Sequence, residues 1–166
     1  MKTTPSLQRI VTALAERHGV DPQRTGTYLR LQLAGHGHLI VENIGAQRVS
    51  VTNYITVGHE LLADPEVVLY MAYHPEGATR AEWVPLEITQ LFGGWSLYAE
   101  PDSQGGLAVY NLVGQAELAD QCERVLAHHL MHDGWLTGGE RANLARPIWT
   151  PEEIEARDIR CDDVPF

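Results

Sequence analysis

The chain has 166 residues, the size of one ordinary domain, and its hydrophobic fraction of 44% is normal for a globular protein. Its 12 basic and 22 acidic residues leave a net charge of −10, and the cations are scattered along the chain, so we expect no binding to duplex nucleic acid. It has no apolar run that could span a bilayer, no signal-peptide pattern, and too few cysteines (Cys122 and Cys161) for a disulfide framework. These features predict a cytoplasmic protein with free thiols and no membrane contact.

The N-terminal segment has the pattern of an amphipathic helix. Thr4 is suited to cap the helix and Pro5 to occupy its first position, while Gly19 is a suitable stop. Four apolar residues recur at helical spacing in between: Leu7, Ile10, Val11 and Leu14. We therefore expect a helix that buries this stripe against the rest of the protein.

The middle of the chain predicts a series of short strands. Alternating or continuous apolar patterns mark strands at 28–33, 39–44, 49–57, 67–73, 83–92, 95–100 and 107–110. The pair within 48–73 forms the centre, with Gly58 and Asp64-Pro65 supplying turns between its two strands. Pro85 lacks a backbone donor, which places its strand at a sheet edge or at a bulge.

A long helix is predicted from Gln115 to His132, ended by Gly134, with Trp135 packing back on its last turn. One face of this helix carries Leu118, Cys122, Val125, Leu126 and His129. We expect three residues of this face to be buried against the central strands: Leu118, Val125 and Leu126. Their expected partners on the strands are Val51, Ile55, Leu69 and Met71.

Because the helices lie at the chain ends and are not interleaved with strands, the fold class is α+β. We predict an antiparallel sheet of five to seven short strands that carries the N-terminal helix and the long C-terminal helix. Residues 1–136 form the core domain, and 137–166 form a linker and a tail.

The tail contains a helix-start signature, in which Thr150 is the N-cap and Glu153 completes a capping box. A helix beginning there is too short to be stable alone, so it must dock through apolar residues. Trp149, Ile154 and Phe166 are the candidates for this contact. The tail can dock on its own core, or on another copy or a protein partner, and we favour the latter.

The stretch from Leu29 to Trp135 resembles an uncharacterised family of small proteins encoded by phages, plasmids and conjugative elements. The matching features are V-S-V at 49–51, Tyr54, L-L-A-D-P-E-V at 61–67, W-x-P-L at 83–86, and a closing helix that ends in Gly-Trp. The chain departs from the family in having Asn53 where a histidine stands. The resemblance implies a mobile-element context and no particular chemistry.

Two histidine patterns are compatible with metal binding. His128 and His132 are four residues apart on the predicted helix, so both can reach one ion, although the local sequence supplies no third ligand. The alternative is that they stabilise the C-terminal end of the helix as cations. His36 and His38 flank Gly37 in a turn, where the glycine more simply indicates a hairpin with positive φ.

Asn53 lies in the apolar register of its strand, so its amide should point into the core. Buried amides are usually paired with backbone groups, and this is one interpretation of the residue. The other is a small pocket lined by Asn53 and its neighbours.

We find no complete catalytic motif and expect no cofactor. The hypothesis favoured by the sequence is a non-enzymatic accessory or protein-interaction protein of a mobile genetic element, such as a phage component or a modulator of host machinery. The alternative is a small metal-dependent or acid–base enzyme whose histidines come together from distant segments.

Overall fold

The computed structural model describes residues 1–57, 60–73, 81–102 and 106–142. Its first half contains one helix and four strands: α1 (Pro5–Arg17), β1 (Tyr28–Leu33), β2 (Gly37–Gly45), β3 (Arg48–Val57) and β4 (Glu60–Ala72). Four more strands follow: β5 (Glu82–Gln90), β6 (Gly94–Leu97), β7 (Ala99–Pro101) and β8 (Leu107–Val109). A long helix and two short elements close the described chain: α2 (Leu112–Gln121), η1 (Cys122–Leu126), α3 (Ala127–His132), α4 (Trp135–Gly138) and β9 (Glu140–Arg141).

Within the described residues, seven strands form one antiparallel sheet in the order β6-β5-β4-β3-β2-β1-β9. Strands β1 to β6 are neighbours in both sequence and space, so the sheet is a meander built from consecutive hairpins. Strands β7 and β8 pair separately as a small hairpin. The predicted α+β class, with an antiparallel sheet and one helix from each end of the chain, is confirmed.

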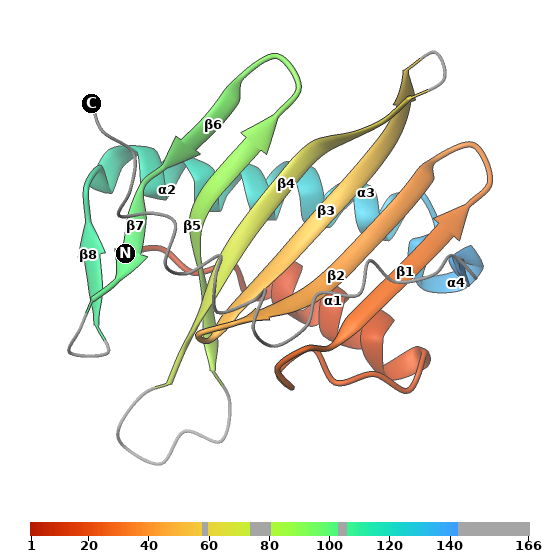
Figure 1. Ribbon diagram of the computed structural model, residues 1–166, viewed down its shortest axis with the longest axis horizontal. Coiled ribbons are helices and arrows are strands. Elements are labelled where there is room, and N and C mark those ends of the chain that lie inside the picture. The colour runs from red at the N-terminus through yellow and green to blue at the C-terminus, as the bar shows by residue number, and fades with distance from the viewer. Residues whose placement is uncertain (58–59, 74–80, 103–105, 143–166) are drawn as a thin grey trace.

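Both long helices lie on the same face of the sheet (Figure 1). The main core fills the space between these two layers and combines the α1 stripe, the sheet residues that face it, and residues of the C-terminal helix. Its largest fully buried side chains include Leu7, Leu14, Leu69, Trp83 and Trp135. None of the helices in the described segments is long and apolar enough to cross a membrane.

A smaller apolar cluster joins the hairpin β7–β8 to the strands β4 and β5. Val68, Tyr70, Leu86 and Ala99 are its buried members, and Leu107 and Val109 pack against them. This arrangement corrects the predicted single strand at 95–100. After Leu97 the chain leaves the edge of the large sheet, and Ala99 starts the separate hairpin because its buried side chain belongs to this second cluster.

The N-terminal helix begins at Pro5 as predicted, but Thr4 does not cap it with its side chain, whose hydroxyl donates to the carbonyl of Trp83 instead. The carboxylate of Glu123 accepts hydrogen bonds from the backbone N–H groups of Ser6 and Leu7, at 2.9 to 3.1 Å. The cap therefore comes from a different helix, which fastens the start of α1 to η1. At the other end Gly19 has φ +65° and closes the helix as expected.

The described part of the predicted linker is structured, which corrects the boundary at 137. Trp135 to Gly138 forms a helical turn, and Glu140 and Arg141 pair with Gln32 and Leu31 of β1. The reason is that an edge strand such as β1 offers free backbone donors and acceptors to a following segment. The predicted tail helix, with Trp149, Ile154 and Phe166, lies outside the described residues.

Candidate functional site

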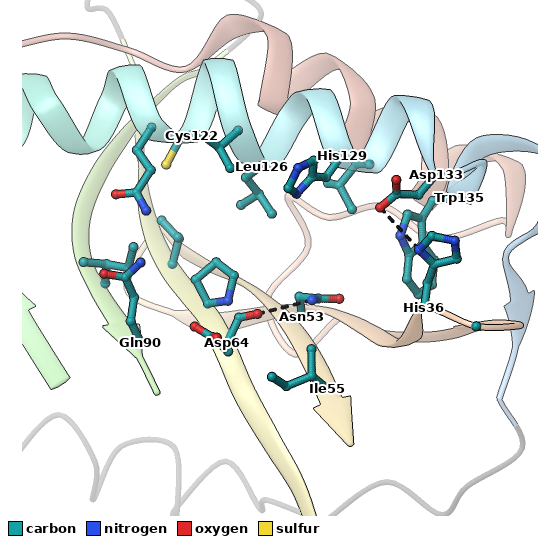
Figure 2. A pocket seen from close by; sticks show the side chains of 17 residues that line it. His36, Asn53, Ile55, Asp64, Gln90, Cys122, Leu126, His129, Asp133 and Trp135 are labelled. Atoms are coloured by element: carbon teal, nitrogen blue, oxygen red, sulfur yellow. Dashed lines mark hydrogen bonds and ion pairs between the residues drawn. The ribbon is translucent and has the colours of Figure 1, made fainter. Parts of the chain in front are cut away.

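A cavity of about 410 Å³ lies between the C-terminal helix and the sheet. Strands β3 and β4 form its floor, and η1 and α3 form its roof (Figure 2). Its volume is in the range of small-molecule sites, roughly 300–1,000 Å³. Val125 and His129 lie at its rim on the helix, where both side chains are exposed, so the space is accessible from solvent.

The floor of the cavity is shaped by a β-bulge. Thr52 pairs with Glu66 and Tyr54 pairs with Ala63, so two residues of β4, Asp64 and Pro65, stand opposite Asn53 alone. This corrects the prediction that Asp64-Pro65 forms a turn, because the pair is an insertion within a continuous strand. A bulge tolerates a proline, since the extra residue is left out of the hydrogen-bonding ladder.

Asn53 lines the cavity, and its side-chain NH₂ donates to the backbone carbonyl of Asp64 at 3.2 Å. The two interpretations of Asn53, pairing with a backbone group and lining a small pocket, are therefore compatible, because the residue does both. The bond to Asp64 uses the nitrogen and sets the direction of the amide, whose oxygen points toward the end of the cavity at His36 (Figure 2). No group in the described segments donates to this oxygen, so it is available to a ligand.

The roof of the cavity is shaped by a π-helical turn. The backbone N–H of Ala127 donates to the carbonyl of Cys122, five residues earlier, within a helix that is otherwise α-helical. In an α-helix, residues four apart drift by about 40° per step. The wider turn reduces this drift, so Leu118, Cys122, Leu126 and Leu130 all remain buried.

The same turn explains why the predicted burial of Val125 is wrong. Val125 is 46% exposed, because the extra residue of the π-turn rotates it from the core to the rim of the cavity. Ile55, also predicted to be in the core, is only partly buried, since its side chain faces the cavity instead of a packed neighbour. The burial of Leu118, Leu126, Val51, Leu69 and Met71 is confirmed.

The lining of the cavity has two parts of different character. An apolar part is formed by side chains of the sheet and the helix: Ile55, Val67, Ile88, Val125, Leu126 and Leu130. Polar side chains are placed around it: His36, Asn53, Asp64, Gln90, Gln121, His129 and Asp133. His36 and Asp133 occupy one end, whereas Gln90 and Cys122 occupy the other (Figure 2).

His36 and Asp133 face each other across the end of the cavity, with 3.4 Å between Nδ1 and Oδ2. This distance exceeds the roughly 2.7–2.9 Å of a strong charge-assisted hydrogen bond, so the contact is weak. His36 comes from the β1–β2 turn, and Asp133 follows the last residue of α3. His38 belongs to β2, where its neighbour across the strands is Tyr54, so the structure separates the two histidines that flank Gly37.

Cys122 lines the cavity but is not a nucleophile at neutral pH. Burial of the thiol, with a smaller contribution from the nearby Glu123 carboxylate, raises its pKa to about 12. The reactive form of cysteine is the thiolate, and it is scarce at such a pKa. The described lining contains no serine or threonine.

His128 and His132, the candidate metal ligands, lie on the exposed side of α3 and do not line the cavity. Their ring centroids are 4.0 Å apart with an angle of 31° between the planes, so the imidazoles face each other. The two rings are therefore close enough for a shared ion, and metal binding by this pair stays a prediction. In the described part of the chain, no three His, Cys, Asp or Glu side chains are grouped to hold a metal.

Comparison of the chain with protein-family models, curated proteins and solved structures finds no match. The fold and the cavity therefore define only a class, an α+β protein with a ligand-sized space between a helix and an antiparallel sheet. Sequence reasoning selected Asn53 but missed His36, Asp64, Gln90 and Asp133 as its companions. The sequence gives only a weak indication that these residues lie together, because they come from four separate segments.

Proposed function

We propose that the protein is a non-enzymatic binding protein that holds a small organic molecule in the cavity between the C-terminal helix and the sheet. The observation that carries this proposal is the cavity itself, about 410 Å³ with an apolar wall and a few polar groups. Two backbone irregularities support it, since the β-bulge in β4 and the π-turn both shape this space. Bulges and π-turns often occur at functional sites.

Binding is favoured over catalysis because of the chemistry of the lining. The buried Cys122 thiol stays protonated at neutral pH because its pKa is raised to about 12. The described lining also holds no serine, threonine or lysine that could act as a nucleophile, and we assign its carboxylates and imidazoles to ligand binding. This proposal specifies the accessory role expected from the sequence, and it does not depend on the mobile-element context, which stays a hypothesis.

The proposal is tested with prodan, a neutral naphthalene fluorophore whose emission shifts to the blue in apolar surroundings. We expect saturable, one-to-one binding to the full-length protein. Val125→Trp places an indole at the rim of the cavity and should lower the affinity at least tenfold. Met131→Trp is the matched control, because Met131 is also exposed on the C-terminal helix but does not line the cavity.

Equal loss of prodan binding in both variants, or no loss in either, would contradict a site in the cavity. Absence of saturable prodan binding to the wild type would count against the proposed function, which fails if the smaller compounds tested below do not bind either. Thermal unfolding of each variant shows whether the fold is retained, since both substitutions lie on an exposed part of the helix.

A second candidate function, protein interaction, is favoured by the hairpin between β5 and β6. Phe92 is 96% exposed and Trp95 is 61% exposed, and β6 is the outer strand of the sheet in the described residues. The indole of Trp95 donates to Glu87 at 2.9 Å, which fixes its orientation. An outer strand flanked by ordered aromatic side chains is suited to pairing with a strand of another chain.

Self-association is the form of this interaction that can be measured directly. We expect sedimentation velocity to show a concentration-dependent dimer that the Phe92→Ala, Trp95→Ala double variant abolishes. Tyr73→Ala is the control, because Tyr73 is also exposed but follows β4 at the end where Ala72 pairs with Glu82, whereas β6 pairs with the other end of β5. A wild type that stays monomeric at high concentration would exclude pairing between copies of this strand.

A further inference from the structure

We infer that the ligand of the cavity is an organic cation with an apolar body, such as a protonated amine, bound with its charge between Asn53 and Asp133. This inference rests on the proposed function and specifies the class of ligand. It depends on the charge of the lining, on the position of the helix end and on the direction of the Asn53 amide.

The charge of the lining disfavours anions. The cavity is lined by two carboxylates, Asp64 and Asp133, by two imidazoles, and by no lysine or arginine. With both carboxylates ionised, the net charge of the lining is zero if both imidazoles are protonated and negative if either is neutral. An anionic ligand would therefore enter without a fixed positive partner, at a cost that grows as water is excluded.

The end of the long helix adds to this preference. Asp133 is the C-cap residue of α3, so its carboxylate stands where the helix presents its last carbonyl groups. The C-terminal end of a helix carries a partial negative charge that attracts cations. A carboxylate at this position is unfavourable by itself, and a bound cation relieves the repulsion.

The contact between His36 and Asp133 leaves room for such a ligand. At 3.4 Å it is too long to satisfy the carboxylate fully, and both side chains are partly exposed. An ammonium group between Asp133 and the Asn53 oxygen would add a charge-assisted bond that the protein alone does not form. Asn53 can accept this bond because its nitrogen is already committed to Asp64.

The apolar part of the cavity indicates that the rest of the ligand, apart from its charged group, is apolar. Val67, Ile88 and Leu126 line the cavity, and Leu126 lies farther from Asp133 than His129 does (Figure 2). A hydrocarbon or aromatic group placed there contributes roughly 25 cal/mol for each Å² of apolar surface that it removes from water. The site therefore accepts an amphiphilic cation and excludes small, strongly hydrated ions.

The test compares three compounds of similar shape and different charge by calorimetric titration of the full-length protein. They are 2-phenylethylamine as its ammonium ion, 2-phenylethanol, and 3-phenylpropionate. We expect the ammonium ion to bind at least tenfold more tightly than the alcohol, and the carboxylate to bind more weakly than both. Equal or tighter binding of the carboxylate would overturn the inference.

A substitution of Asp133 tests whether this carboxylate causes the preference for a cation. Asp133→Asn should lower the affinity for the ammonium ion at least tenfold and change that for the alcohol less than twofold. Glu117→Gln is the matched control, since it removes one exposed carboxylate from the same long helix away from the cavity. An unchanged affinity for the ammonium ion in Asp133→Asn would also overturn the inference.

These outcomes are separate from those of the proposed function. If prodan binds and is blocked by Val125→Trp while the ammonium ion does not bind, the cavity is a ligand site and the assigned class of ligand is wrong. If neither prodan nor any of the three compounds binds, the proposed function itself fails. Should Asp133→Asn not fold, the comparison of the three compounds on the wild type decides alone.

Discussion

The layer between the helices and the sheet is filled at one end and hollow at the other. Where α1 crosses the sheet, the core side chains Leu7, Val11, Leu14 and Trp83 are fully or almost fully buried. Where η1 and α3 cross β3 and β4, the same layer encloses the cavity beside Asn53. Both regions are built from the same kinds of elements, so element type does not explain the difference.

The hollow region differs in that the backbone is irregular in both facing layers, the sheet and the helix. Helix α1 is a regular α-helix whose apolar stripe matches the sheet beneath it. The hollow region contains the bulge at Asp64-Pro65 and the π-turn at 122–126, each of which adds one residue to its element. Each insertion changes which side chains face inward, and it places polar groups such as Asn53 where the filled region has aliphatic ones.

The largest expected effect comes from truncation in the filled region. Trp83→Ala removes a fully buried ring and should reduce the free energy of unfolding by about 3–5 kcal/mol, because the packed surroundings cannot collapse into the space. Ile55→Ala, which enlarges an existing cavity, should cost less than about 1.5 kcal/mol. Urea denaturation of both variants measures the contrast, and equal losses would contradict it.

Larger side chains should be costly at a tightly packed position and tolerated in the cavity. A methyl group at Gly114 would lie 2.4 Å from a ring carbon of Tyr98, so Gly114→Ala should cost about 1–3 kcal/mol through overpacking. Ile55→Phe adds more atoms but directs them into the cavity, and we expect a change below about 0.5 kcal/mol in either direction. Chemical denaturation measures both variants, and a tolerated Gly114→Ala would show that the contact between α2 and Tyr98 is loosely packed.

The junction of the two regions can be tested at Glu123, which belongs to the π-turn and caps α1. Glu123→Ala leaves the N–H groups of Ser6 and Leu7 without their acceptor and should cost about 1–2 kcal/mol. Glu117→Ala, an exposed substitution in the same long helix, is the control and should change stability by less than about 0.5 kcal/mol. If the two variants unfold alike, the cap contributes nothing to the attachment of α1.

The smallest effect near neutral pH concerns the thiol of Cys122. Its pKa is raised from 9.0 to about 12 in the folded state, so the folded protein retains a proton that the unfolded chain releases between these values. Stability should therefore be unaffected by this group below pH 9.0 and should fall as pH rises from 9.0 to about 12. The free energy of unfolding is measured against pH for Cys161→Ser and for the Cys122→Ala, Cys161→Ser double variant. Only Cys161→Ser, which keeps the Cys122 thiol, should lose stability above pH 9.0.

Much of the fold was predictable because local patterns carry it. The stripe of α1, the alternation in 28–57 and the stop at Gly134 each depend on residues close together in sequence, and each appears in the structure. The class of the fold followed from the order of these elements. Pro85 was assigned to an edge or a bulge from its missing donor alone, and the register of β4 and β5 shifts beside it.

The candidate site was predictable only at Asn53, where a polar residue interrupts an apolar register. The remaining polar residues of the cavity have no local signal. His36 comes from a turn, Asp64 from a bulge that resembles a turn in sequence, and Asp133 from a helix end. Glu123 likewise gives no sign in the sequence that it caps a helix more than a hundred residues earlier.

By itself, the amino-acid sequence determined the elements, their order and the apolar faces that they bury, because these follow from periodicity over a few turns or strand residues. Only the tertiary structure decided where the layers separate to form a cavity. A bulge and a π-turn each change the pattern by one residue, which lies within the uncertainty of any boundary read from sequence. Their joint effect exists only because β4 and η1, remote in the chain, are packed on opposite sides of the same space.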